Sequence, residues 1–263
     1  MKFEKMLNPF PKLIFALLAS ILSAPGVAAP LKFCYEDVPQ KPWTMPDGTG
    51  LNITLLKRVE KLLGESFSYT TKPWSRCQEE TRVGALDGYF AASITDVRRQ
   101  YSVFPSLPDG SPDNSAVMYE DRFDVYLRKG GEGLWDGKQL RSPRHPIVAQ
   151  RGYFVATVLR AHGLVVEESI KSAEDGLRLL SQNMADVVVL QGNEARDLAT
   201  NDPRFKDSVV TTSTPYLVLP LYLAINRGTY LQNPKRIEAI WAAIGKVRNS
   251  PDYHTLLDAA GVR

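Results

Sequence analysis

Short apolar segments alternate with helix-compatible segments from residue 31 onward, and this alternation constrains the fold more than any other feature of the chain. Residues 31–35, 66–70 and 87–93 have the length and composition of strands. Residues 51–64 carry apolar side chains at helical spacing, and residues 75–83 are polar but compatible with a helix. The order strand, helix, strand, helix, strand predicts an α/β fold with a parallel sheet and crossover helices.

A second series of the same kind follows residues 105–114, a segment rich in Pro, Gly, Asp and Ser that we expect to be an exposed loop. Ser172 is placed to cap one of its helices, with acidic residues in the first turn. Strand patterns lie at residues 122–128, 147–150, 164–167, 186–190, 209–212 and 217–225, and helix patterns at residues 153–161, 172–182, 193–200, 233–247 and 252–260.

The α/β block at residues 130–212 separates the first series from the closing helices. A chain that builds one lobe, leaves for a second and returns must cross between them twice, and we expect the crossings at residues 124–129 and 213–220. The predicted lobes are residues 30–126 with 216–263, and residues 127–215. Such a protein has a ligand cleft at the carboxyl ends of its strands.

Residues 1–29 have the pattern of a secretory signal peptide. Lys2, Lys5 and Lys12 come before an apolar run at residues 13–22, and small residues precede the expected cleavage before Pro30. The run is too short to span a hydrocarbon core of roughly 30 Å, which disfavours a retained anchor. We therefore expect the chain to be exported.

Removing 29 residues from 263 leaves 234, and takes away three lysines and one glutamate. The remaining 29 basic and 28 acidic residues give a net charge of +1. This balance gives no electrostatic reason to expect a nucleic acid or an anionic membrane as partner. Cys34 and Cys77 both lie in the exported part, where two cysteines most simply form one disulfide; two unpaired buried thiols are the alternative.

Several sequence segments together resemble a known family. The segments LKFCYED, KPWSR, LDGYFAASITDVRRQYSVF, DVYLRKG, AQRGYF, ADVVVL and TPYLVLPLYLAINR follow one another in this order. Their order and spacing resemble the family 3 extracellular solute-binding proteins, the polar amino-acid receptors of ABC importers, over nearly all of residues 30–263. The resemblance implies the type II periplasmic binding fold, in which two α/β lobes close on a ligand around a two-strand hinge.

The same resemblance implies a biological setting. It implies a periplasmic monomer that binds a small molecule, uses no cofactor and no metal, and delivers its ligand to an ABC permease in the inner membrane. In the family, a Ser or Thr that ends a strand and an Arg five residues later hold the ligand carboxylate, and Ser93 and Arg98 match them. A planar guanidinium suits a carboxylate because it donates two parallel hydrogen bonds. The alternative is that Arg98 is a solvated surface charge.

Further ligand contacts are implied on the first lobe. Many relatives have an aromatic residue after the second strand that stacks on the ligand, and Trp74 takes roughly that place; packing in the lobe core is its alternative. Arg76 lies near the same rim as a second candidate contact for an anion. The first-strand acid that meets the ligand amine in relatives corresponds to Glu36 or Asp37, and we prefer Glu36.

The sequence departs from the family pattern in the second lobe. Tyr153 and Phe154 stand where relatives have glycine-rich turns, which predicts a cleft partly filled by aromatic rings. Gln191 stands where amino-acid receptors have an Asp that binds the ligand ammonium. A neutral amide cannot neutralise a buried ammonium, so a plain α-amino acid is in doubt unless Glu36 or another nearby acid compensates.

The two cysteines fit this picture, because Cys34 lies on the first predicted strand and Cys77 in the turn that follows Trp74. A disulfide between them would hold the segment with Trp74 and Arg76 beside the cleft.

An enzymatic function is the main alternative, since cyclohexadienyl dehydratases share the fold that the resemblance implies. The three histidines, His145, His162 and His254, have no pairwise metal-binding spacing. Nor does the sequence contain a nucleophile elbow or a phosphate-binding loop. We therefore predict a non-catalytic binding protein, with a sensory module that uses the same cleft as a further alternative.

Overall fold

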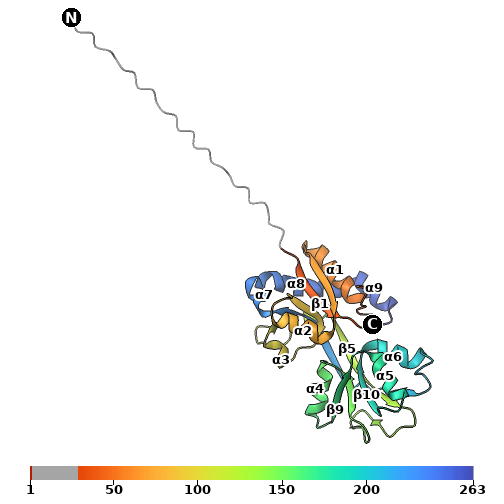
Figure 1. Cartoon of the computed structure of the whole chain (residues 1–263). Helices are drawn as coiled ribbons and strands as arrows, with labels where there is room; N and C mark the ends of the chain where they lie inside the picture. Colours follow the sequence, from red (N-terminus) through yellow and green to blue (C-terminus); the bar gives the residue numbers. More distant parts are fainter. Residues whose placement is uncertain (2–28, 263) are drawn as a thin grey trace.

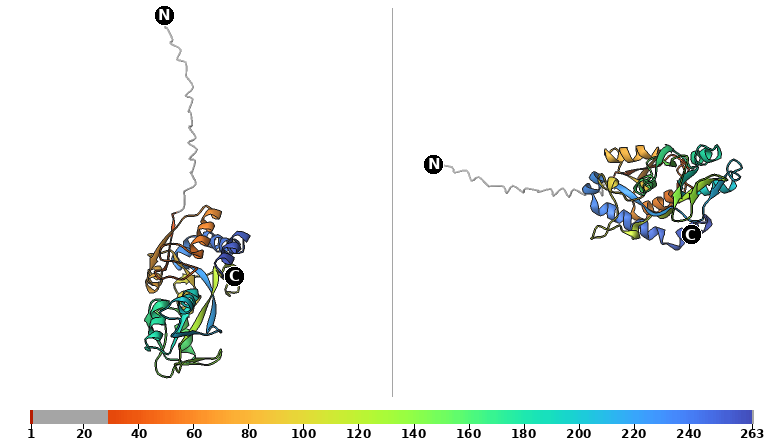
Figure 2. Two further views of the ribbon diagram at one scale, coloured as in Figure 1. Left: turned by 90° about the vertical axis from the view of Figure 1, so that its right-hand side faces the viewer. Right: turned by 90° about the horizontal axis from the view of Figure 1, so that it is seen from below.

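The structure of this protein is a computed structural model that describes Met1 and residues 29–262. The expected signal peptide therefore lies almost entirely outside the described residues. None of the helices in residues 29–262 is long and apolar enough to cross a membrane. Two lobes, each a sheet with flanking helices, lie one above the other, which confirms the predicted two-lobed α/β fold (Figures 1 and 2).

The first lobe is built on a sheet in the order β2-β1-β3-β12, in which β1 pairs in parallel with both β2 and β3. Its helices lie on both sides of this sheet (Figure 1). The elements are β1 (Leu31–Glu36), α1 (Leu51–Leu63), β2 (Phe67–Lys72), α2 (Trp74–Arg82), β3 (Gly88–Ala92), α3 (Asp96–Arg99), β4 (Ser102–Val103), a 3-10 turn (Asn114–Ala116), α7 (Arg227–Gln232), α8 (Pro234–Arg248) and α9 (Pro251–Ala259).

The second lobe continues the sheet in the order β5-β10-β8-β9, with β10, β8 and β9 parallel and β5 antiparallel to β10. A small hairpin, β6 with β7, extends from it. The elements are β6 (Leu134–Trp135), β7 (Leu140–Arg141), β8 (Ile147–Gln150), α4 (Phe154–Ala161), β9 (Val166–Ile170), α5 (Ala173–Ser181), β10 (Val187–Gln191), α6 (Gly192–Asn201) and β11 (Val209–Thr211).

Two long antiparallel strands, β5 (Tyr119–Arg128) and β12 (Leu217–Asn226), join the lobes. They pair with each other from Tyr119 opposite Leu221 to Phe123 opposite Leu217. Beyond this shared stretch β12 pairs with β3 in the first lobe, and β5 pairs with β10 in the second. A chain that passes twice between the lobes is what the interrupted strand–helix series predicts. The boundaries at residues 126 and 216 stay a prediction.

Local sequence signals explain where several helices begin. Helix α5 begins after Ser172, whose hydroxyl accepts from the Asp175 backbone N–H, while the Asp175 carboxylate accepts from the Ser172 N–H. Helix α1 follows Gly50, which has a φ of 113°. A Cβ there would lie 2.5 Å from the backbone oxygen of Trp43, so only glycine fits this approach.

The structure differs from the sequence predictions at several elements. Helix α2 begins at Trp74, one residue before the predicted helix at residues 75–83, so Cys77 lies on this helix and not in a turn after Trp74. Strand β9 begins at Val166, two residues later than expected, and β5 begins at Tyr119 because pairing with β12 extends it. The β6–β7 hairpin and α7 were not predicted, since such short elements show no hydrophobic period.

Candidate functional site

A pocket lies between the lobes, at the carboxyl ends of β1, β3 and β10. About 40 Å³ of it is open to water-sized molecules, which is room for a few waters. Its lining comes from both lobes and from the two connecting strands. The lining residues are Tyr35, Glu36, Gln40, Thr44, Trp74, Phe90, Ala91, Ser93, Arg98, Tyr119, Phe123, Tyr153, Phe154, Gln191 and Leu221.

Arg98 is buried at one side of this pocket, with 5% of its surface exposed. Its Nη1 donates to both the carbonyl oxygen and the hydroxyl of Ser93, each at 2.8 Å. Its Nε donates to Gln78 at 3.2 Å, and its Nη2 reaches the carbonyl of Gly152 in the second lobe at 3.3 Å. The guanidinium lies over the ring of Trp74, 5.4 Å from its centre.

The Arg98 guanidinium has no acidic partner among residues 29–262, because every group that accepts its hydrogen bonds is neutral. Burial lowers the pKa of the guanidinium from its usual value. Arginine nevertheless stays charged in proteins. The pocket therefore holds a positive charge that the described protein groups do not neutralise, and an anion would satisfy it.

The pocket wall also includes Glu36, the last residue of β1. The Tyr153 hydroxyl from the second lobe donates to the Glu36 carboxylate and accepts from Gln40 Nε2, the latter at 2.9 Å. Burial raises the pKa of Glu36 to about 8, although the hydrogen bond from Tyr153 by itself lowers this pKa. Asp37, its neighbour, instead forms an ion pair with Lys171 at 2.8 Å and does not line the pocket.

Gln191 lines the pocket where β10 ends and α6 begins. Its Nε2 donates to Asp121 Oδ2 at 2.9 Å. Asp121 lies on β5 and is 4% exposed, and burial raises the pKa of its carboxyl to about 7. The sequence analysis missed this residue. Asp121 lies outside the predicted strand at residues 122–128, and only the pairing of β5 with β12 places it on the same buried face as Tyr119 and Phe123.

The lobes touch across the pocket through polar contacts as well as apolar ones. Besides the bonds from Arg98 to Gly152 and from Tyr153 to Glu36, Lys41 Nζ lies 3.6 Å from Glu194 Oε2. Gly152 packs closely on α2, since a Cβ there would lie 3.4 Å from Gln78 Nε2. This arrangement is a closed one, in which the Tyr153 side chain fills part of the space between the lobes.

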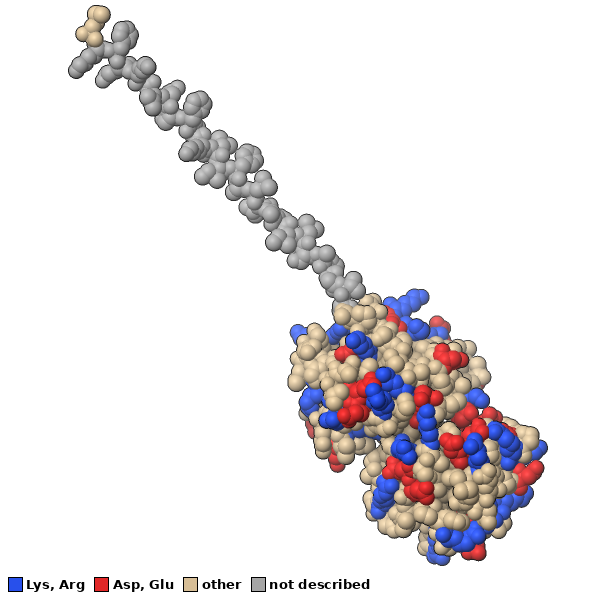
Figure 3. All heavy atoms as spheres, viewed as in Figure 1, with Lys and Arg blue, Asp and Glu red and all other residues tan. Residues whose placement is uncertain are grey.

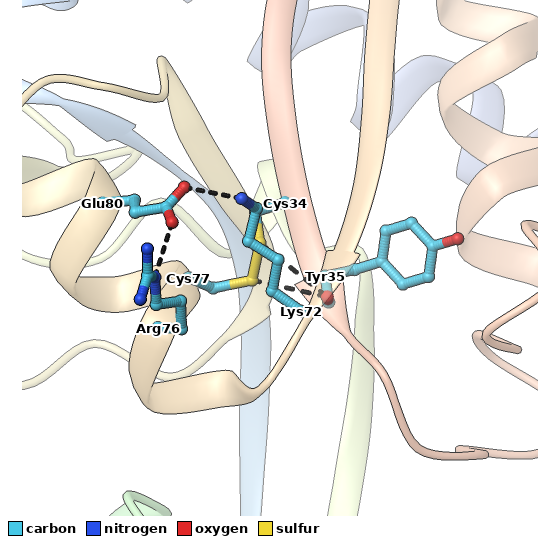
Figure 4. The surroundings of a disulfide bond; sticks show 6 residues. All are labelled: Cys34, Tyr35, Lys72, Arg76, Cys77 and Glu80. Atoms are coloured by element: carbon cyan, nitrogen blue, oxygen red, sulfur yellow. Dashed lines mark hydrogen bonds and ion pairs between the residues drawn. A yellow bond between two sulfur atoms is a disulfide. The ribbon is translucent and has the colours of Figure 1, made fainter.

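The structure confirms the disulfide between Cys34 on β1 and Cys77 on α2 (Figure 4). It joins β1 to α2 at Cys77, three residues after Trp74, the first residue of that helix. Trp74 is 8% exposed and packs edge-on against Tyr89, so the ring is part of the lobe core and of the pocket wall at once.

Arg76 does not reach the pocket, which corrects its place in the predicted site. Its side chain is 69% exposed, and its Nε donates to Glu80 at 2.7 Å (Figure 4). Glu80 also pairs with Lys72 at 2.8 Å. Because Arg76 and Glu80 lie one helical turn apart, the helix directs the guanidinium along its own surface and away from the pocket.

The remaining candidates of the sequence analysis lie together. Ser93 and Arg98 are bonded to each other, and the pocket brings them together with the other predicted contacts Glu36, Trp74, Tyr153 and Gln191. Their roles toward a ligand stay predictions. Within residues 29–262 no cluster of His, Cys, Asp and Glu is arranged to hold a metal ion.

No protein-family model and no curated protein matches the chain. Solved structures are similar to it over most of its length. The ligand-binding core of GluR0 from Nostoc punctiforme, in complex with L-glutamate, is 19% identical, with a TM-score of 0.67 over 89% of this chain and 100% of that one. The arginine-specific periplasmic binding protein STM4351 of Salmonella typhimurium is also 19% identical, with a TM-score of 0.64 over 88% and 99%.

A histidine kinase sensor domain with similarity to periplasmic binding proteins is 14% identical, with a TM-score of 0.70 over 89% of this chain and 96% of that one. An ancestral amino-acid-binding protein, described as a precursor of cyclohexadienyl dehydratase, is 18% identical, with a TM-score of 0.65 over 87% and 93%. At these identities the likenesses show the fold, which is that of the two-lobed periplasmic binding proteins.

Proposed function

We propose that this chain is a periplasmic solute-binding protein that captures a small carboxylate-bearing ligand, an amino acid or a related compound, by closure of its lobes. The observation that carries the proposal is the buried Arg98 guanidinium, which faces the interlobe pocket without an acidic partner among the described residues. A buried charge without a partner is costly, and a ligand carboxylate would remove that cost. The similar structures bind L-glutamate and arginine, which are both carboxylates.

Closure follows from contacts that need both lobes. Ser93 and Arg98 would anchor the carboxylate on the first lobe, and Tyr153 and Gln191 would complete the site from the second. Because these last contacts form only when the lobes meet, the ligand binds the closed form more tightly and shifts the population toward it. In this structure the Tyr153 hydroxyl donates to the Glu36 carboxylate, so this hydrogen bond must break before a ligand group can bind Glu36.

We further propose that a signal peptide of residues 1–29 directs the protein to the periplasm, where it acts as a monomer and delivers its ligand to an ABC permease. On the face drawn in Figure 3, acidic and basic side chains are interspersed over both lobes, which suits a soluble carrier. N-terminal sequencing of the exported protein should begin at Pro30. Gel filtration should give the mass of one chain.

Isothermal titration of the purified protein with L-glutamate, L-glutamine and L-arginine tests the proposed capture. Binding of one of these compounds should vanish in Arg98→Met and persist in Arg76→Met, the matched control whose guanidinium is outside the pocket. Equal binding by wild type and Arg98→Met would contradict the proposal.

The sensor-domain likeness favours one second candidate, a sensory module without a transporter. The two functions differ in their consequence for the cell. Loss of the gene should stop uptake of the labelled ligand if the protein serves an importer. It should leave uptake intact and change gene expression if the protein serves a receptor. Conversion of the bound compound by the purified protein alone would instead indicate an enzyme related to the dehydratase lineage.

A further inference from the structure

Gln191 presents a neutral amide to the pocket, but a carboxyl group lies directly behind it. Asp121 accepts from Gln191 Nε2 at 2.9 Å through Oδ2, and from the Arg122 backbone N–H at 2.8 Å through Oδ1. No cationic side chain of residues 29–262 forms an ion pair with Asp121. The guanidinium of Arg122, its neighbour on β5, bonds Asp124 instead.

This contact fixes which end of the amide faces the pocket. An amide has one donor end and one acceptor end, and only the donor end makes a favourable contact with the Asp121 carboxylate. The carbonyl end, Oε1, is therefore left for the pocket, and no residue of the described chain donates a hydrogen bond to it. A carboxylate that orients a ligand-binding side chain in this way is a frequent arrangement in metal sites.

We propose that Asp121 is a positioning residue for an ammonium group of the ligand. It holds Gln191 with Oε1 toward the pocket, and it supplies the negative charge that the amide lacks. The ligand is then a zwitterion, with its carboxylate on Arg98 and its ammonium on Gln191. This inference rests on the proposed function and extends it to the second charge of the ligand.

The two halves of the ligand would thereby engage different lobes. Arg98 belongs to α3 of the first lobe, whereas Gln191 ends β10 of the second. A zwitterion that spans them gains its second contact only in the closed form, which is the condition for ligand-driven closure. A carboxylate without an ammonium would bind Arg98 but would gain less from closure.

The arrangement also predicts proton release on binding. An ammonium near Gln191 favours the ionised form of Asp121, so affinity for a zwitterion should rise from pH 6 to pH 8 as that carboxyl loses its proton. Other charged or titratable groups lie around Asp121, and its effect must be separated from theirs by substitution. These groups are Arg122, Asp124 and Tyr126 on β5, Tyr119 at its start, Tyr153 beside α4 and Glu36 on β1.

The test uses three pairs of compounds whose members differ only in the α-ammonium. They are L-glutamate with glutarate, L-glutamine with 4-carbamoylbutanoate, and L-arginine with 5-guanidinopentanoate. In titrations at pH 8, wild type should prefer the ammonium-bearing member of the pair it binds by at least tenfold. Asp121→Asn should lose about tenfold of that preference while its affinity for the other member stays unchanged.

Matched variants separate positioning from folding. Glu120→Gln removes an exposed acid from the other face of the same strand and should keep the preference. Gln191→Asp in the Asp121→Asn background places a carboxylate at the pocket and should restore it. If Asp121→Asn does not fold, Gln191→Met should show the same loss of preference. Titrations in phosphate and Tris should show less proton release at pH 7 for Asp121→Asn than for wild type.

An equal loss of affinity for both members of a pair, or no loss for either, would overturn the role of Asp121. The proposed function would survive that outcome if Arg98→Met still abolished binding of both members. If none of the six compounds binds wild type, the zwitterion inference and the carboxylate capture would both fail.

Discussion

Two buried charges in this molecule have opposite surroundings. The Asp186 side chain, just before β10, is fully buried, and two arginines meet it, Arg144 and Arg128, the latter at 3.8 Å, together with the imidazole of His145 at 3.3 Å. Arg98, in the pocket between the lobes, is almost as buried and is bonded only to neutral groups. Within the described chain, the Asp186 carboxylate has partners of opposite charge, and the Arg98 guanidinium has none.

The difference separates a structural charge from a ligand-binding one. Removing water from a charge costs several kcal/mol, and a partner within the protein offsets that cost only at Asp186. The carboxyl groups of the two regions follow the same logic. The hydrogen bond from Arg144 lowers the pKa of Asp186, whereas burial raises the pKa of Glu36 to about 8.

The largest effect is expected from Arg98→Met. Loss of the guanidinium should weaken binding of the ligand carboxylate at least a hundredfold, or about 3 kcal/mol. The free energy of unfolding without ligand should stay the same or rise, because a buried unpaired charge has been replaced by an apolar side chain. Titration calorimetry and urea unfolding measure the two quantities. A large loss of stability with intact binding would make Arg98 a structural residue.

Asp186→Asn should show the reverse, a loss of stability with ligand binding intact. The substitution leaves Arg144 and Arg128 without their shared acid. Because 37% of the Arg144 side chain is exposed and water screens it, we expect a loss of about 2 kcal/mol in the free energy of unfolding, below the 3–5 kcal/mol of a fully buried pair. Urea unfolding at pH 7 measures it. An unchanged midpoint would show that this cluster does not stabilise the lobe.

The pH dependence of stability should have opposite signs in the two regions. The lowered pKa of Asp186 stabilises the fold above the usual Asp range near pH 4, and that contribution is lost as the pH falls. The raised pKa of Glu36 works the other way, because stability is lost as the pH rises from about 4.5 to about 8. Glu36→Gln should remove this second loss, because the glutamine side chain does not titrate. If Glu36→Gln gives the same unfolding curves as wild type from pH 4 to 9, the raised pKa of Glu36 would be contradicted.

Tyr153→Phe should have the smallest effect. It removes the hydroxyl that joins Glu36 and Gln40 across the pocket, so the closed form should lose about 1 kcal/mol relative to an open one. Small-angle scattering should give a larger radius of gyration for the free variant. Tyr216→Phe, whose hydroxyl bonds His162 away from the pocket, is the control and should scatter like wild type.

The sequence predicted the fold well where hydrophobic patterns are long or fully buried. The apolar run before Gln191 marked β10 to within one residue, and the capped pattern after Ser172 marked α5. Short elements were not predicted, because two-residue strands such as β6 and β7 form by pairing with each other and are too short to show a hydrophobic period in the sequence. Residues 119–121 joined β5 only through pairing with β12, which no local pattern reveals.

The site was predictable in its residue types but not in its pairings. The resemblance to the solute-binding family correctly predicted that Arg98, Ser93 and Gln191 lie at one pocket. It also suggested Arg76, although the spacing of four residues between Arg76 and Glu80 in the sequence already indicated that the two pair along a helix. Asp121 went unnoticed because an acid on a strand reads as exposed until the sheet shows which face is buried. Contacts between lobes, such as Tyr153 with Glu36, depend on tertiary geometry alone.

We expect the Arg98 guanidinium to bind the carboxylate of the ligand directly. Nitrogen-detected NMR of ¹⁵N-arginine-labelled protein can test this, because it follows individual guanidinium groups during titration with the compound that binds. The account predicts that the Nε and Nη resonances of Arg98, assigned by their loss in Arg98→Met, shift on binding while those of Arg144 stay in place. Saturating ligand that leaves the Arg98 resonances unmoved would contradict it.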